Sequence, residues 1–141
     1  MIGGYVYRER DVEMQSRLER RLDDSQPRIP VWDKGYLFHD RPFSDDRTSR
    51  LISDDTIVLS QDILVTAQAD GEYRRLDLRA DFAERLSRDA TAAFDAIASD
   101  YRMAVVRRRG PEKTLFLVSN RAGSGRIYYH TTKSGLVFCS G

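Results

Sequence analysis

Residues 114–141 read TLFLVSNRAGSGRIYYHTTKSGLVFCSG, and they indicate the architecture more clearly than any other part of the chain. An apolar run at 115–118 is followed by a polar turn with two glycines, by a second run at 126–130 and by a Lys-Ser-Gly turn at 133–135. A third apolar run, at 136–139, completes the pattern. Apolar runs that alternate with glycine turns are typical of hairpins, so this stretch predicts an antiparallel meander of three strands.

The rest of the chain predicts two helical regions and further strands. Residues 8–24 place Val12, Met14 or Gln15, Leu18 and Leu22 at helical spacing among charged side chains, which indicates an amphipathic helix. Residues 75–98 carry a second helical face, with an expected break near Ser87. Apolar and β-branched runs predict five more strands, at residues 5–7, 36–38, 56–60, 63–67 and 101–106.

This order of elements predicts an α+β fold with antiparallel sheets, in a single domain that covers residues 1–141. The polar stretch 44–55 is expected to be a surface loop, whereas the runs 56–60 and 63–67 are expected to be core strands. With 141 residues and 40% hydrophobic content, the chain is long enough for one modest core and too short for two full domains.

Charged residues make up 32% of the chain, but the net charge is only +1. A nucleic-acid-binding arm or a polybasic membrane patch needs a field of one sign, so neither partner class is expected. Of the 23 basic residues, only Lys34, Lys113 and Lys133 are lysines. A bias of the genome toward arginine explains this composition better than a separate function for every guanidinium group.

The chain contains no apolar run that approaches the roughly 18 to 20 residues of a membrane-spanning helix, so a cytoplasmic location is expected. The only cysteine, Cys139, has no partner for an internal disulfide. With His39 and His130 as the only histidines, the sequence predicts no zinc site, and it shows no other metal or cofactor motif.

The closing stretch resembles the end of the glutaminase domain in the asparagine synthetase family, which includes the β-lactam synthetases. That family reads Arg-Asp-Arg-Leu-Gly-Ile-Arg-Pro-Leu-Tyr-Tyr and then Gly-Leu-Val-Phe-Ala-Ser-Glu. The matching residues here are 119–123, 127–129 and 135–140. The resemblance implies a class II glutamine amidotransferase domain of the N-terminal-nucleophile (Ntn) hydrolase type, with two stacked antiparallel sheets flanked by helices.

The same resemblance implies that the catalytic nucleophile is missing. The family begins Met-Cys-Gly-Ile, and after removal of the methionine the cysteine attacks glutamine. This chain begins Met1-Ile2-Gly3-Gly4, so Ile2 stands at the nucleophile position. An alkyl side chain has no lone pair and no proton to lose, and it cannot form an acyl-enzyme. We therefore expect a degenerate domain without glutaminase activity and without catalytic residues.

Other positions match the family's glutamine-binding site. Asp70 and Gly71 match an Asn-Gly pair whose amide donates to the oxyanion, and a carboxylate at that point has the wrong charge for this role. Arg41 matches the arginine that binds the substrate carboxylate, and Asp100 matches the aspartate that holds its amino group. The resemblance thus implies that Arg41, Gly71 and Asp100 are remnants of a substrate site. A surface ion pair and a turn aspartate would account for Arg41 and Asp100 equally well.

In the family, the glutaminase domain is followed by an ATP-pyrophosphatase domain with a Ser-Gly-Gly-x-Asp-Ser loop, and this sequence contains no such motif. The resemblance therefore implies a scaffold or partner domain for a separate ATP-dependent, amide-forming synthetase chain, or a homo-oligomer. Two alternatives stay open. One is an active glutamine-hydrolysing amidotransferase domain whose N-terminus is misassigned or processed, and the other is a small α+β binding protein that matches the family by chance.

Overall fold

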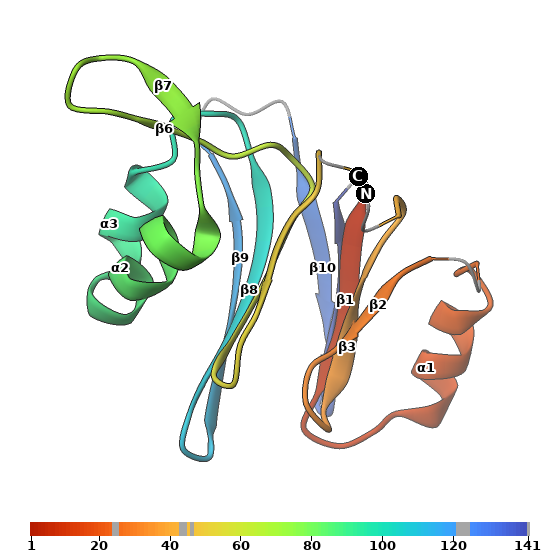
Figure 1. Ribbon diagram of the computed structural model, residues 1–141. Helices are drawn as coiled ribbons and strands as arrows, with labels where there is room; N and C mark the ends of the chain where they lie inside the picture. The colour runs from red at the N-terminus through yellow and green to blue at the C-terminus, as the bar shows by residue number, and fades with distance from the viewer. Residues whose placement is uncertain (24–25, 43–44, 46, 121–124, 141) are drawn as a thin grey trace.

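The structure, a computed structural model, describes residues 1–23, 26–42, 45, 47–120 and 125–140. In these residues the chain forms eleven strands in three antiparallel sheets, together with three α-helices (Figure 1). This arrangement confirms the expected α+β class with antiparallel sheets. None of the described helices has the length and the apolar composition that a membrane crossing requires.

The largest sheet has five strands, with β1 at its centre. In spatial order they are β10 (Ile127–Thr131), β11 (Gly135–Ser140), β1 (Ile2–Tyr7), β3 (Gly35–His39) and β2 (Arg28–Pro30). The register pairs Gly3 with Cys139 on one side and with Phe38 on the other. The first and the last strand are therefore neighbours, and the N and C labels lie together in Figure 1.

The second sheet has four strands. In spatial order they are β4 (Ser49–Ile52), β5 (Thr56–Ser60), β8 (Arg102–Arg109) and β9 (Glu112–Ser119). The expectation of a surface loop over residues 44–55 is wrong for β4. In this strand Ser49 and Leu51 are buried while Arg50 and Ile52 are exposed, which is the period of two that a strand with one buried face shows.

The closing stretch does not form one meander of three strands. β8 and β9 form a hairpin in which Arg109 pairs with Glu112, and β10 and β11 form another in which Ile127 pairs with Ser140. Between the two hairpins the chain passes from the four-stranded to the five-stranded sheet. The turn between two strands determines how they pair as a hairpin, whereas tertiary packing determines which sheet the hairpin joins.

The third sheet is a hairpin of β6 (Val65–Ala67) and β7 (Tyr73–Arg75) that projects from the body of the molecule (Figure 1). The prediction that residues 63–67 form a core strand is wrong for most of this run, because only Leu64 and Thr66 are buried in it. Short runs of β-branched residues do not reveal from sequence alone which of them will be covered by other elements.

The helices are shorter than the helical patterns. α1 (Val12–Glu19) begins after Asp11, whose carboxylate accepts a hydrogen bond from the Met14 N–H and so caps the helix. Residues 75–98 contain a π-helical turn, η1 (Leu78–Phe82), followed by α2 (Ala83–Arg88) and α3 (Ala90–Asp95). The expected break is present at Asp89, which is extended and caps α3.

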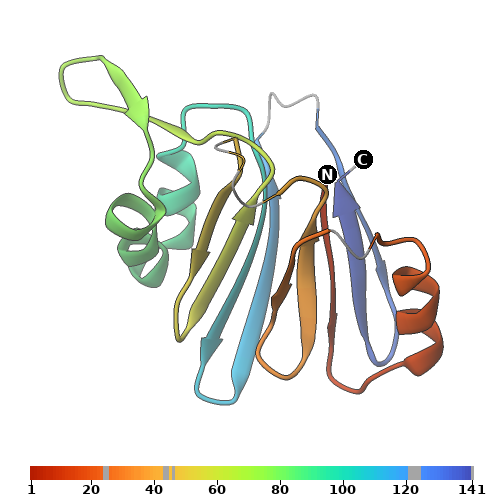
Figure 2. The ribbon, with the colours of Figure 1, turned by 45° about the vertical axis from the view of Figure 1, so that its right-hand side comes forward.

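Side chains of the two larger sheets share one apolar core, which we call the inter-sheet core. Its buried members are Ile2, Ile29, Val31, Leu37, Ile57, Leu59, Ala104, Val106 and Phe138. A second core lies on the other face of the four-stranded sheet, where Phe82, Leu86 and Ala93 pack. Figures 1 and 2 show the resulting order of layers: α2 with α3, the four-stranded sheet, the five-stranded sheet, and α1.

Glycines let other groups approach β1 closely. A Cβ atom at Gly4 would lie 2.7 Å from the ring of Phe138. A Cβ atom at Gly35 would lie 2.0 Å from the carbonyl oxygen of Tyr5, and the φ of +132° at Gly35 also disfavours any side chain. The central strand is therefore packed more tightly than a strand without glycine neighbours could be.

Candidate functional site

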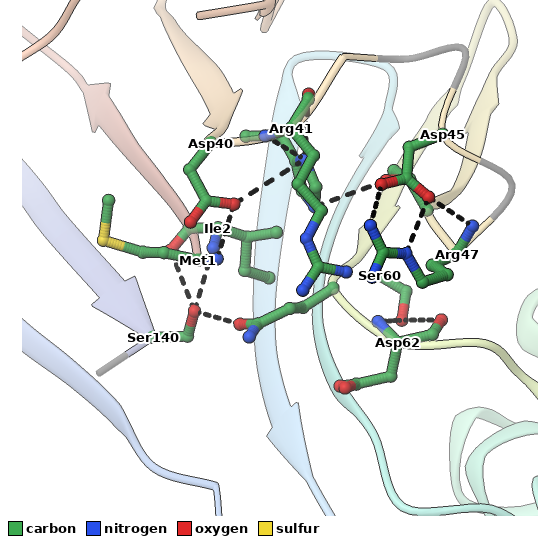
Figure 3. A network of polar contacts seen from close by, with 12 residues as sticks. Met1, Ile2, Asp40, Arg41, Asp45, Arg47, Ser60, Asp62 and Ser140 are labelled. Atoms are coloured by element: carbon green, nitrogen blue, oxygen red, sulfur yellow. Dashed lines mark hydrogen bonds and ion pairs between the residues drawn. The ribbon is translucent and has the colours of Figure 1, made fainter.

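Ile2 occupies the N-terminal end of β1, where the family resemblance places a nucleophile. Its side chain is fully buried (0% exposed) and belongs to the inter-sheet core. Polar residues gather around this strand end, as Figure 3 shows. We call this group the N-terminal site, and it consists of Met1, Ile2, His39, Asp40, Arg41, Gln61 and Ser140.

Ser140 joins the last strand to the first strand and to the end of β5. Its Oγ accepts a hydrogen bond from the Ile2 N–H at 2.8 Å. The same hydroxyl lies 3.3 Å from the Ile2 carbonyl oxygen and makes a short hydrogen bond to Gln61 Oε1. Because a hydroxyl has one hydrogen, it donates to one of these two oxygens at a time. The fully buried Ser140 thus satisfies backbone groups where the β1–β11 ladder ends.

Asp40 holds the backbone of Met1. Its carboxylate lies 2.7 Å from the Met1 amine, and its N–H donates to the Met1 carbonyl oxygen at 3.0 Å. Both partners of the ion pair are more than a third exposed, so solvent screens their attraction. The ion pair therefore contributes more to the position of Met1 beside Ile2 than to the stability of the fold.

His39 is buried in the same site. Its Nδ1 lies 2.9 Å from the backbone nitrogen and 3.1 Å from the carbonyl oxygen of Arg41, so either neutral tautomer finds a partner there. Burial lowers the pKa of His39, and the Met1 amine and the Arg41 charge act in the same direction. The hydrogen bond to the Arg41 carbonyl and the charge of Asp40 oppose this shift. The imidazole is therefore neutral at pH 7.

Arg41 is partly exposed, and in Figure 3 its side chain extends between the Met1 and Ile2 side and the Ser60 and Asp62 side of the network. Within the described part of the chain, its guanidinium makes no hydrogen bond or ion pair. Asp45 is bound instead by Arg47, which donates to both carboxylate oxygens, at 3.0 and 2.7 Å. Arg41 thus presents a cation to the N-terminal site.

Arg102 and Asp62 close the turn after β5. The Asp62 carboxylate accepts from the Arg102 N–H at 2.8 Å and lies 3.3 Å from the Arg102 guanidinium. Ser60 Oγ accepts from the Asp62 N–H at 3.2 Å, so the turn is bonded at both ends. Both residues of the Asp62 and Arg102 ion pair are largely covered, and they fix the segment that carries Gln61.

Asp70 and Gly71 are not brought to Ile2. Both lie in the exposed turn of the β6–β7 hairpin, where Asp70 accepts from the Glu72 N–H at 2.9 Å and Gly71 has a φ of +87°. Figures 1 and 2 both show this hairpin projecting away from the N-terminus. Their positions give no support to the oxyanion and substrate roles that the resemblance implies for them.

Asp100 lies just before β8, whose first residue, Arg102, is part of the turn that carries Gln61. Asp100 is exposed, and its carboxylate accepts a hydrogen bond of 2.6 Å from the Asn120 side chain. This bond ties the start of β8 to the end of β9. The observed partner is thus the one expected for a turn residue, and of the matched positions the structure unites Ile2 and Arg41 in one site.

Gln61 and Ser140 are members of the site that the sequence analysis does not predict as such. Each is the polar residue at the end of an apolar run, 56–60 in one case and 136–139 in the other. That pattern marks strand ends. It contains no signal that the two strand ends meet across 79 residues of sequence.

The N-terminal site can hold an anion at Arg41, but it lacks the groups for acyl transfer. Its one hydroxyl, Ser140, is bonded to an amide and not to a base, so it is not activated as a nucleophile. In the described ranges, no group of three or more His, Cys, Asp and Glu side chains is arranged to hold a metal ion.

Comparison of the chain with protein-family models, with curated proteins and with solved structures finds no match. The choice of a function therefore depends on the N-terminal site and on the order of the layers.

Proposed function

We propose that this chain is a non-catalytic domain of the class II glutamine amidotransferase type, similar to the glutaminase domains of the asparagine and β-lactam synthetases. It has an Ntn-hydrolase-like antiparallel sandwich and serves as scaffold or partner half for a separate ATP-dependent synthetase that forms amides. The order of layers supports the proposal, because two antiparallel sheets share a core and helices lie on both outer faces.

The burial of Ile2 carries the proposal. A glutaminase of this type needs a thiol or hydroxyl at the end of the central strand, next to a free amine that acts as its base. Isoleucine supplies neither a lone pair nor a transferable proton, and here its side chain packs in the inter-sheet core like any other aliphatic residue. A domain with this residue at this place keeps the architecture without the chemistry.

Arg41 and Gln61 are consistent with a former glutamine site. The Arg41 guanidinium faces a strand end and has no side-chain partner among the described residues, so it is suited to bind a carboxylate in a two-pronged manner. An amide side chain is also present at this strand end, in Gln61, but its oxygen is bonded to Ser140. The groups for binding are thus partly present, while the amide is engaged in holding the strands together.

The first test is glutamine hydrolysis. The purified protein should release no ammonia above the buffer background, measured as ammonium and glutamate at saturating glutamine. Intact-mass spectrometry of the same sample identifies the N-terminal residue, so that a processed terminus would be seen. Ammonia release together with covalent labelling of an N-terminal Cys, Ser or Thr by a glutamine-analogue electrophile would overturn the proposal in favour of an active amidotransferase.

The second test concerns the partner. An ATP-pyrophosphatase-type synthetase encoded beside this chain should co-elute with it from a size-exclusion column. The complex should form its amide product from free ammonia and not from glutamine, and Arg41→Ala should leave this ammonia-dependent rate unchanged. Glutamine-dependent product formation, or the absence of a complex at micromolar concentrations, would contradict the scaffold role.

A further inference from the structure

A groove separates the free edges of the two larger sheets. β9 and β10 are the last strands of their sheets, so among the described residues neither has a strand on its outer side. A pocket of about 360 Å³ between them is lined by Leu115, Leu117, Ser119, Ile127, Tyr129 and Leu136. Leu115 and Leu136 also line a second pocket, of about 820 Å³. The two pockets therefore adjoin at these two side chains, and we call them together the edge groove.

One part of the edge groove is aliphatic. Leu115, Leu117, Ile127 and Leu136 are partly buried and pack against the inter-sheet core. Among the residues that the structure describes, the lining of this part includes no charged side chain. An apolar chain placed there would extend the core and remove these side chains from water, which is favourable.

The other part of the groove is basic, and we call it the basic mouth. Its described lining includes Arg8, Lys34, Lys113 and Lys133, against a single carboxylate, Glu112. All three lysines of an arginine-rich chain thus line one pocket. Charges of one sign around a recess attract a ligand of the opposite sign.

Two of the four cations at the basic mouth have polar partners in the described part of the chain. Lys113 Nζ lies 3.4 Å from the exposed carboxylate of Asp33, and Lys34 Nζ donates to the Arg8 carbonyl oxygen at 3.5 Å. The Asp33 carboxylate offsets one positive charge, and the carbonyl offsets none. The mouth therefore stays net positive.

The distance between β9 and β10 argues against an inserted peptide strand as the occupant of the groove. β9 and β10 approach each other to within 8 Å, Cα to Cα, at several positions. A strand inserted between them would need about 9.6 Å, which is two strand spacings, so at those positions the gap is too narrow for a peptide that pairs with both edges. From Lys113 to Ser119, β9 is about 20 Å long at the rise per residue of a strand. The groove along it is therefore long enough for an extended alkyl chain.

We propose that the edge groove binds a free amphipathic anion, with an aliphatic chain between β9 and β10 and a carboxylate or phosphate group at the basic mouth. The aliphatic residues line a pocket and are only partly exposed, so an occupant must enter the groove to cover them. A single amphiphile in solution can do so, whereas the flat surface of a bilayer cannot. This proposal is independent of the proposed function.

The chain contains its own reporter for the test. Trp32 is the only tryptophan, and its ring centre lies 5.9 Å from Lys113 Nζ. Laurate and dodecyl phosphate, titrated below their micelle concentrations, should change the Trp32 fluorescence saturably, and calorimetry should give the same affinity. Dodecyltrimethylammonium, which has the same chain and the opposite charge, should not saturate, and inorganic phosphate should not compete at equal concentration.

Two pairs of variants locate the binding. Lys113→Gln combined with Lys133→Gln should weaken laurate binding about tenfold, whereas Arg88→Gln, which neutralises an exposed cation on α2, should not. Tyr129→Glu places a negative charge in the groove and should also weaken binding about tenfold. Tyr73→Glu is its matched control, because both tyrosines are 68% exposed and Tyr73 lies on β7.

Each of the following results would overturn the proposal. They are equal binding of the cationic amphiphile, unchanged affinity in the Lys113 and Lys133 double variant, and binding to phosphatidylglycerol vesicles without binding of monomeric laurate. The last result would assign the basic mouth to a lipid surface. If none of these probes binds, a small amphiphile is likewise rejected as the ligand, and a protein partner becomes the next candidate for the groove.

Discussion

His39 is enclosed by the Met1 amine, Asp40, Arg41 and Thr48, and its burial lowers its pKa. In the unfolded chain the imidazole has its ordinary pKa of about 6.5. Between the two values the unfolded state binds more protons than the folded state, so the free energy of unfolding rises with pH in that window. The folded N-terminal site is therefore most stable when the His39 imidazole is neutral.

We expect this stabilisation to be complete above about pH 6.5 and to be lost as the pH falls through the folded-state pKa of His39. Urea unfolding from about pH 8 down to about pH 5.5 measures it. His39→Gln should flatten the dependence of the free energy of unfolding on pH. His130→Gln removes the only other histidine of the sequence, which is exposed on β10, and should preserve that dependence. An NMR titration in which the His39 imidazole protonates above pH 6.5 would refute this expectation.

Strands that pair through their own tight turn are predictable from sequence, because alternation and turn residues lie in the same short stretch. β8 with β9 and β10 with β11 are hairpins of this kind. β4 is not predictable in this way, because a strand of four residues with two apolar ones resembles a loop. The division of the hairpins between two sheets also leaves no local signal, since apolar alternation looks the same in either sheet.

Gly35 at the start of β3 offers a test of how tightly that strand is packed. Gly35→Ala should destabilise the protein by about 3 kcal/mol, because the new Cβ would meet the Tyr5 carbonyl in addition to the strained φ. Gly71→Ala is the matched control, with a positive φ and no atom within 4 Å, and should cost about 1 kcal/mol. Thermal and urea unfolding of both variants give the difference. Equal losses would show that β3 can move away from β1.

The N-terminal site is assembled from segments that are distant in sequence, and this limits what the sequence can predict of it. The resemblance points to Ile2 and Arg41, and the structure places both there. It also points to Asp70 and Gly71, which lie in the projecting hairpin. Ser140 meets Ile2 across 138 residues, and such a contact follows from the packing of whole sheets and not from any local pattern.

Ser140→Ala tests whether this contact holds the molecule together. The substitution leaves the Ile2 N–H without its acceptor at the buried strand end, which should cost about 1 to 3 kcal/mol. Ser87→Ala, which removes an exposed hydroxyl from α2, should stay within about 0.5 kcal/mol of the parent. Hydrogen exchange gives the local measurement, because the Ile2 amide should exchange faster in Ser140→Ala. An unchanged protection of that amide would contradict the bond.

The pairing of β1 with β11 has a consequence for biosynthesis. A ribosome delivers β11 more than a hundred residues after β1, so one edge of the central strand has no partner during the synthesis of the residues between them. Contacts of such high sequence separation slow folding. We expect the five-stranded sheet to be completed only when β11 has left the ribosome, and until then the nascent chain to depend on chaperones that cover the open edge of β1.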